Sequence, residues 1–207
     1  MIKAILYDLD GVLVDACEWH YESLNRALFD TYGFKISRED HEKTYNGLPT
    51  RSKLSIMVEK DLIDKKDIDR IWNLKQNHTE KAISDLAKDD EDKITIHKIT
   101  RLMGMKSACV TNSIEKTAKL MLRNTGQIDY LDVIISNEDV SSPKPDPEGY
   151  IKAMRLLGVN PSEVIIIEDS DVGNASARAS GGNVVRVRDP YDVTLEKICK
   201  SIILHSE

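Results

Sequence analysis

Short apolar runs recur along the chain, each four to six residues long and rich in Val and Ile. Turn-forming or polar residues bound each run. Half-exposed strands alternate apolar and polar residues, whereas continuous apolar runs of this length are typical of parallel strands covered on both faces. The predicted strands span residues 2–7, 106–111, 132–135, 164–167 and 184–187.

Helical patterns lie between the later runs. Ser113 can cap the first of these helices, and Asp146 followed by Pro147 can start the second, which ends at Gly158. The predicted helices span residues 113–123, 146–158 and 171–180. Strands that alternate with helices predict an α/β fold, with a doubly wound parallel sheet joined by right-handed crossovers.

The segment from residue 15 to residue 90 has a different pattern, because it contains no comparable apolar run. Amphipathic helices are predicted there over residues 16–32, 38–45, 50–62 and 66–87. The acidic run 89–92 then marks a solvated junction. We therefore expect two domains. An α/β core comprises residues 1–14 and 91–207, and a helical domain of residues 15–90 is inserted after the first strand.

Composition narrows the class of protein. A hydrophobic fraction of 41% and a charged fraction of 31% argue against a disordered or fibrous chain. The apolar runs are far shorter than the ~20 residues of a membrane span, and Asp8 and Asp10 interrupt the first run too early for a signal peptide. A net charge of −6 disfavours nucleic acid as a partner. The short apolar runs predict no membrane partner. The three cysteines form no Cys-x-x-Cys pair, so we expect a reducing, cytoplasmic location.

Polar side chains follow four of the predicted strands, directly or in the next loop. In an open parallel sheet, ligands bind at the edge where the strands end. Each group alone has an ordinary interpretation, as an acidic turn, a helix cap or a linker lysine. Their recurrence at successive strand ends favours one functional site. In chain order, these residues are Asp8 and Asp10, Thr111 and Asn112, Lys144 in a proline-rich loop, and Glu168 and Asp169.

The residue types indicate the chemistry of this site. Four carboxylates at one edge would repel one another and a phosphate, and a bound cation removes that repulsion. Oxygen ligands suit Mg²⁺. A lysine and a hydroxyl can hold phosphate oxygens. One carboxylate can attack phosphorus to form an aspartyl-phosphate, while a second exchanges protons with the leaving oxygen and with water. The set therefore predicts Mg²⁺-dependent phosphoryl transfer.

In these motifs and their order, the chain resembles the haloacid dehalogenase superfamily. The resemblance covers nearly the whole chain and points to the branch with an inserted helical cap, which includes β-phosphoglucomutase-like and phosphoglycolate-phosphatase-like proteins. It implies a role for each matching residue. Asp8 is the nucleophile; Asp10 is the general acid and base, and its backbone carbonyl also binds the metal; Thr111, Asn112 and Lys144 bind phosphate; Glu168 and Asp169, with Asp8, bind Mg²⁺.

Asp10 also distinguishes between branches, because members that cleave carbon–halogen or carbon–phosphorus bonds lack an aspartate at this position. We therefore expect a Mg²⁺-dependent phosphatase that acts on a small phosphorylated metabolite, such as a sugar phosphate, as a monomer or weak homodimer. A phosphosugar mutase would use the same catalytic residues and stays open as an alternative. A catalytically idle binding protein of the same fold is a further alternative, although the complete motif set argues against it.

Three residues of the helical insertion lie where similar capped members place substrate-contacting side chains. The resemblance therefore implies a specificity role for His20, Arg51 and Lys75. The alternative interpretations are a helix-surface histidine, a loop arginine and an exposed lysine. The chain departs from these members at Ala16, where Ser or Thr is common, and at the acidic run 89–92, where Pro-Gly is common. The sequence therefore predicts no particular substrate.

Overall fold

The computed structural model describes residues 1–205. The chain forms two compact units. We call them the core unit, which comprises Met1–Asp15 and the chain from Lys88 onward, and the helical unit, Ala16–Ala87. Within the described residues, every helix is too short or too polar to cross a membrane.

The core unit is built on a five-stranded parallel sheet with the strand order β3-β2-β1-β4-β5. This confirms the predicted parallel sheet and places the first strand at its centre. The strands are β1 (Ala4–Tyr7), β2 (Lys106–Val110), β3 (Val133–Ile135), β4 (Val164–Glu168) and β5 (Asn183–Arg186). Because β1, β2 and β4 are the inner strands, the residues that follow them meet at the middle of one sheet edge.

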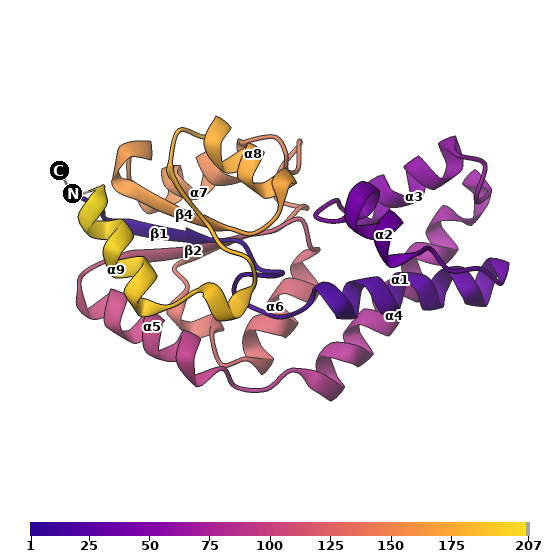
Figure 1. The fold of residues 1–207 in the computed structure, drawn as a ribbon, viewed down its shortest axis with the longest axis horizontal. Helices are drawn as coiled ribbons and strands as arrows, with labels where there is room; N and C mark the ends of the chain where they lie inside the picture. Colours follow the sequence, from indigo (N-terminus) through magenta and orange to yellow (C-terminus); the bar gives the residue numbers. More distant parts are fainter. Residues whose placement is uncertain (206–207) are drawn as a thin grey trace. The chain divides into compact units, whose positions relative to one another are not determined.

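Helices cover both faces of the sheet, with α7 and α8 on one side and α5 and α6 on the other (Figure 1). On β1, Leu6 packs into the apolar cluster beneath α7, whereas the ring of Tyr7 meets His97 of α5. Burial on both faces explains why the strands read as continuous apolar runs. The core helices are α5 (Glu91–Leu102), α6 (Glu115–Asn124), α7 (Glu148–Leu157), α8 (Asp171–Ala179) and α9 (Leu195–Leu204).

Two predicted helix starts are wrong by one or two residues. Ser113 does not cap α6, whose N-cap is Ile114. The N-cap of α7 is Pro147, although the Asp146 carboxylate still accepts a hydrogen bond from the Glu148 amide at 2.9 Å. In both cases the predicted polar residue lies just outside the helix. The Ser113 hydroxyl bonds to Asp10, and the Asp146 carboxylate bonds to the first turn of α7.

The acidic run 89–92 follows the boundary between the two units and is mostly exposed, as expected for a solvated junction, and it also starts a helix. Asp90 is the N-cap of α5, and its Oδ1 accepts a hydrogen bond from the Lys93 amide at 2.9 Å. Glu91 and Asp92 occupy the first turn, where negative charge interacts favourably with the helix dipole. The acidic run therefore starts a helix that the hydrophobic pattern did not reveal.

The helical unit has its own apolar core, which includes Leu24, Leu28, Leu54 and Ile71. Its segments follow the predicted ranges, except that the third helix ends at Glu59 instead of residue 62. The segments are α1 (Cys17–Tyr32), α2 (Arg38–Asp40) continued by a π-helical turn (His41–Tyr45), α3 (Thr50–Glu59) and α4 (Ile68–Leu86). Short 3₁₀ turns lie at Lys65–Asp67, Ile128–Tyr130, Pro161–Glu163 and Pro190–Asp192.

Candidate active site

Three carboxylates meet at the edge of the sheet where β1 and β4 end. Asp8 directly follows the central strand, and its amide donates to the Ile167 carbonyl oxygen at 3.0 Å, which continues the pairing with β4. Glu168 is the last residue of β4, and Asp169 follows it. One carboxylate oxygen from each of Asp8, Glu168 and Asp169 lies within 4.8 Å of the others. The structure thus brings together residues separated by about 160 positions in the chain.

Lys144 reaches this cluster from the loop before α7. Its Nζ donates to Asp8 Oδ1 at 2.7 Å and to Glu168 Oε1 at 2.6 Å. Asn112 holds the backbone of the lysine, because its amide group donates to the Lys144 carbonyl and accepts from the Lys144 amide, both at 3.0 Å. The loop after β2 therefore positions the buried Lys144 ammonium group between the Asp8 and Glu168 carboxylates.

Asp10 and Thr111 are linked through Ser113, the residue that the helical pattern predicts as a cap. The Ser113 hydroxyl donates to Asp10 Oδ2 at 2.9 Å. The Ser113 amide donates to Thr111 Oγ1 at 3.0 Å. These contacts join the segments that follow β1 and β2, so Ser113 orients the Asp10 carboxylate. The sequence offered no signal for this pairing beyond a hydroxyl close to a strand end.

The cluster carries excess negative charge. Burial, followed by the negative charge of Glu168, raises the pKa of Asp8 well above its usual range, although Lys144 acts in the opposite direction. Burial and Glu168 also raise the pKa of Asp169, to about 7. Burial disfavours the Lys144 ammonium, but Asp8 and Glu168 outweigh it and raise the lysine pKa. The lysine stays charged and offsets only part of the carboxylate repulsion.

Two oxygens of the cluster fit a divalent cation. Glu168 Oε2 and Asp169 Oδ1 are buried, and neither has a hydrogen-bond partner within the part of the chain that is described. An unpaired buried carboxylate oxygen is costly, and a cation would satisfy it. The donors are all oxygens, which suits Mg²⁺ better than zinc or copper.

Gly173 brings the first turn of α8 directly against the Glu168 carboxylate. A Cβ atom at this position would lie 2.0 Å from Glu168 Oε2 and 2.1 Å from Cδ. The Ser170 hydroxyl caps this turn by accepting from the Gly173 amide at 3.0 Å. Only glycine allows this approach, so the backbone of α8 helps to fix the carboxylate.

Tyr150 is a member of the site that the sequence did not reveal. It lies fully buried in α7, six residues after Lys144. Its hydroxyl donates to Glu168 Oε1 at 2.5 Å and accepts from Lys144 Nζ at 3.0 Å. A tyrosine on the apolar face of a helix usually needs a partner for its hydroxyl, and that was the available signal. The pattern could not identify the partner, because Glu168 lies at the end of β4, far from α7 in the chain.

In the helical unit, His20 and Lys75 lie together. Lys75 Nζ and His20 Nδ1 are 2.9 Å apart, and the two residues are only 5% and 9% exposed. The alternative interpretations as a surface histidine and an exposed lysine are therefore wrong. Arg51 lies in the first turn of α3 and not in a loop. Arg51 Nη1 forms an ion pair with Asp69 Oδ1 at 2.8 Å. The guanidinium also lies over a Trp72 ring, with Cζ 5.1 Å from the ring centre.

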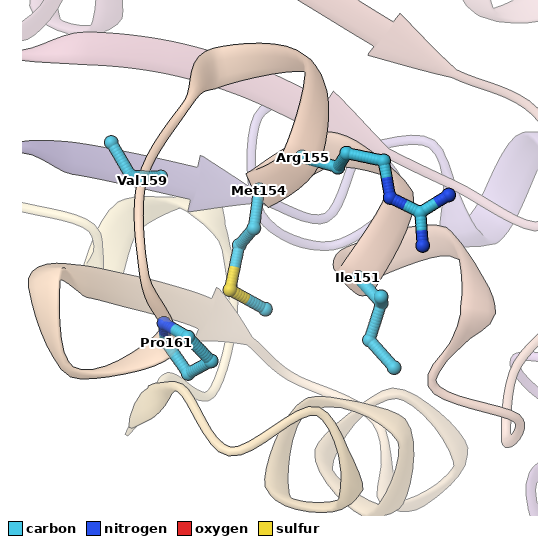
Figure 2. Close-up of a pocket in the computed structure, with 5 residues that line it drawn as sticks. All are labelled: Ile151, Met154, Arg155, Val159 and Pro161. Atoms are coloured by element: carbon cyan, nitrogen blue, oxygen red, sulfur yellow. The ribbon is translucent and has the colours of Figure 1, made fainter.

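A separate pocket is lined by residues of α7 and of the loop that follows it (Figure 2). Its lining is apolar apart from the guanidinium of Arg155, which Figure 2 shows beside Ile151. It includes none of the predicted site residues. The candidate active site is therefore the polar cluster at the sheet edge.

Comparison with known proteins supports this assignment. A family model for haloacid dehalogenase-like hydrolases matches residues 5–187. A phosphorylated carbohydrates phosphatase from Thermotoga maritima is 31% identical over 183 residues, which cover 87% of this chain and 82% of the relative. A plasmid-encoded phosphoglycolate phosphatase from Cupriavidus necator is 30% identical over 199 residues, with 91% and 81% covered.

A solved structure shares the whole fold. The β-phosphoglucomutase from Clostridium difficile superposes with a TM-score of 0.85 over 100% of this chain and 99% of its own, at 20% sequence identity. This likeness confirms the predicted α/β fold. Both curated relatives are phosphatases, and the predicted enzyme class, a hydrolase of the haloacid dehalogenase type, is confirmed. The chain thus belongs to the haloacid dehalogenase-like hydrolase family.

Proposed function

We propose that the chain is a Mg²⁺-dependent phosphatase that hydrolyses a small phosphomonoester, such as a sugar phosphate, through an aspartyl-phosphate on Asp8. The observation that carries the proposal is the buried cluster of Asp8, Glu168 and Asp169 with Lys144 beside it. The two relatives are named as phosphatases of phosphorylated carbohydrates and of phosphoglycolate. These names support a small phosphorylated substrate for this chain.

Asp8, Glu168 and Asp169 would hold Mg²⁺ through their carboxylates, and Asp10 through its backbone carbonyl. When bound, the cation supplies positive charge that offsets both the carboxylates and the phosphate oxygens. The unpaired oxygens of Glu168 and Asp169 support this assignment. The assignment of the Asp10 backbone carbonyl to the metal rests on the family resemblance. The Asp10 carboxylate itself accepts a hydrogen bond from the Ser113 hydroxyl.

Different residues of the core unit carry out the nucleophilic attack, the proton transfers and the binding of the phosphoryl group. An Asp8 oxygen attacks phosphorus, and the bond from phosphorus to the leaving alcohol oxygen breaks. Asp10 gives its proton to that oxygen. Asp10 then takes a proton from the water that attacks the aspartyl-phosphate, so that inorganic phosphate leaves and Asp8 is restored. Lys144, the Thr111 hydroxyl and the backbone N–H of Asn112, whose side chain holds the Lys144 loop, would hold the phosphoryl oxygens.

The helical unit would act as the cap that selects the substrate. His20 and Lys75 already form a buried polar pair, and such a pair can bind substrate hydroxyl or anionic groups. Arg51 remains part of this proposal, and binding substrate would require it to exchange its partner Asp69. The proposal retains the cytoplasmic location and the monomer or weak homodimer expected from the sequence.

The test is inorganic phosphate release from a broad panel of phosphorylated metabolites, with Mg²⁺ and with a chelator. The proposal predicts Mg²⁺-dependent release concentrated on a few compounds. If no compound of the panel released phosphate in the presence of Mg²⁺, the result would contradict the proposal. Isomerised sugar phosphate with little free phosphate would instead indicate a phosphosugar mutase, in which the phosphoryl group returns to the sugar.

A further inference from the structure

The two oxygens of the Glu168 carboxylate have different surroundings. Oε1 accepts two hydrogen bonds, from Lys144 Nζ at 2.6 Å and from the Tyr150 hydroxyl at 2.5 Å. Oε2 is buried and has no such partner within residues 1–205. One oxygen is therefore held by the protein, while the other is available to a cation.

Tyr150 and Lys144 do not hold Oε1 in the same way. The lysine is charged, and it also contacts Asp8, so an arriving phosphate can draw it away from Glu168. The tyrosine is neutral and fully buried in α7. Its hydroxyl can therefore keep its hydrogen bond to Oε1 whichever partner the lysine takes.

We propose that Tyr150 is a positioning residue for the divalent cation, one that holds Glu168 Oε1 toward the protein so that Oε2 stays directed at the metal. This inference rests on the proposed Mg²⁺ site. Partners that orient a metal-binding carboxylate contribute strongly to metal affinity, and removing one typically weakens binding by about 10- to 100-fold. A partial rotation of the carboxylate, which would turn Oε2 away from the metal, would also break the tyrosine hydrogen bond to Oε1.

The experiment compares Tyr150→Phe with Tyr7→Phe. Both substitutions remove one phenol oxygen from a fully buried ring of the core unit, but the Tyr7 ring packs against His97. Mg²⁺ affinity is measured on the substrate-free protein by calorimetry, with Mn²⁺ binding followed by electron paramagnetic resonance. Thermal unfolding verifies that each variant is folded.

We expect the Kd for Mg²⁺ to rise about 10-fold or more in Tyr150→Phe and to stay within about twofold of wild type in Tyr7→Phe. In the phosphatase assay, the Mg²⁺ concentration for half-maximal rate should rise by a similar factor. The rate at saturating Mg²⁺ and the KM for substrate should change much less, which a general loss of structure would not produce.

The outcomes separate this inference from the proposed function. A wild-type protein that binds Mg²⁺ and releases phosphate, together with unchanged Mg²⁺ affinity in Tyr150→Phe, would overturn the positioning role alone. Equal weakening in both tyrosine variants would also overturn it, because the effect would then be one of general packing. A wild-type protein that binds no Mg²⁺ would overturn the metal site and the positioning role together.

Discussion

Gly173→Ala introduces one methyl group at the point where α8 meets the proposed metal site. The new Cβ would lie 2.0 Å from Glu168 Oε2, whereas non-bonded heavy atoms keep about 3.5 Å apart. Either the carboxylate or the first turn of α8 must therefore move by about 1.5 Å. A displacement of this size at a reacting centre can cost about 100-fold in rate, and overpacking of a buried site costs about 1–3 kcal/mol.

The assay measures kcat and Mg²⁺ affinity together with thermal unfolding. We expect activity to fall by about two orders of magnitude and Mg²⁺ affinity to weaken, with a decrease of several degrees in Tm. The matched control is Gly104→Ala. Gly104 has a φ of +78°, so alanine there meets backbone strain, but a Cβ has no heavy atom within 4 Å. The control should lower Tm and leave kcat unchanged.

Wild-type kcat and Mg²⁺ affinity in Gly173→Ala would refute the reasoning, because they would show that the position of Glu168 does not govern the site. Equal losses of activity in Gly173→Ala and Gly104→Ala would also refute it, because the effect would then follow general stability.

Three further predictions concern charge, metal and pH. Lys144→Gln leaves the Asp8 and Glu168 carboxylates without their shared cation. We expect the free energy of unfolding in urea to fall by about 3–5 kcal/mol and phosphate release to fall at least about 100-fold. Wild-type stability would contradict this. Mg²⁺ at about 100 times its Kd should add about 2.7 kcal/mol of stability, seen as a rise in Tm that a chelator reverses. Burial lowers the pKa of His97 from 6.5 to about 4, so its contribution to stability is complete above pH 6.5 and is lost as the pH falls toward 4. The His97 contribution to the free energy of unfolding should fall by up to about 3 kcal/mol over that range, while the raised pKa values of Asp8 and Asp169 act in the opposite direction. It is therefore measured as the change, across this pH range, in the difference between wild type and His97→Asn in a urea-unfolding series.

The sheet and the core of the site were predictable because their signals are local. A strand buried on both faces is apolar over most of its length, and residues 164–167 of β4 are therefore visible without any structure. Parallel strands end at one edge, so Asp8 and Glu168 could be expected to meet despite their separation in the chain. The nature of the groups then indicated a cation and a phosphate.

The remaining features depend on contacts between distant elements. Tyr150 reads as an ordinary core residue, and only the packing of α7 over β1, β2 and β3 brings its hydroxyl to Glu168 at the end of β4. Ser113 has the residue type of a helix cap, but its hydroxyl bonds to Asp10 instead. Helical spacing also could not show that His20 and Lys75 are buried together, because both faces of α1 and α4 carry polar residues.

The central claim is that Asp8 carries the phosphoryl group during turnover. The most direct measurement is rapid acid quench of the Mg²⁺-loaded enzyme with a substrate from the panel, followed by peptide mass spectrometry and hydroxylamine treatment. We expect a hydroxylamine-sensitive phosphoryl group on the peptide containing Asp8, absent from Asp8→Asn and from enzyme treated with chelator. Steady Mg²⁺-dependent phosphate release by Asp8→Asn, or a phosphoryl group on another residue during turnover, would contradict the account.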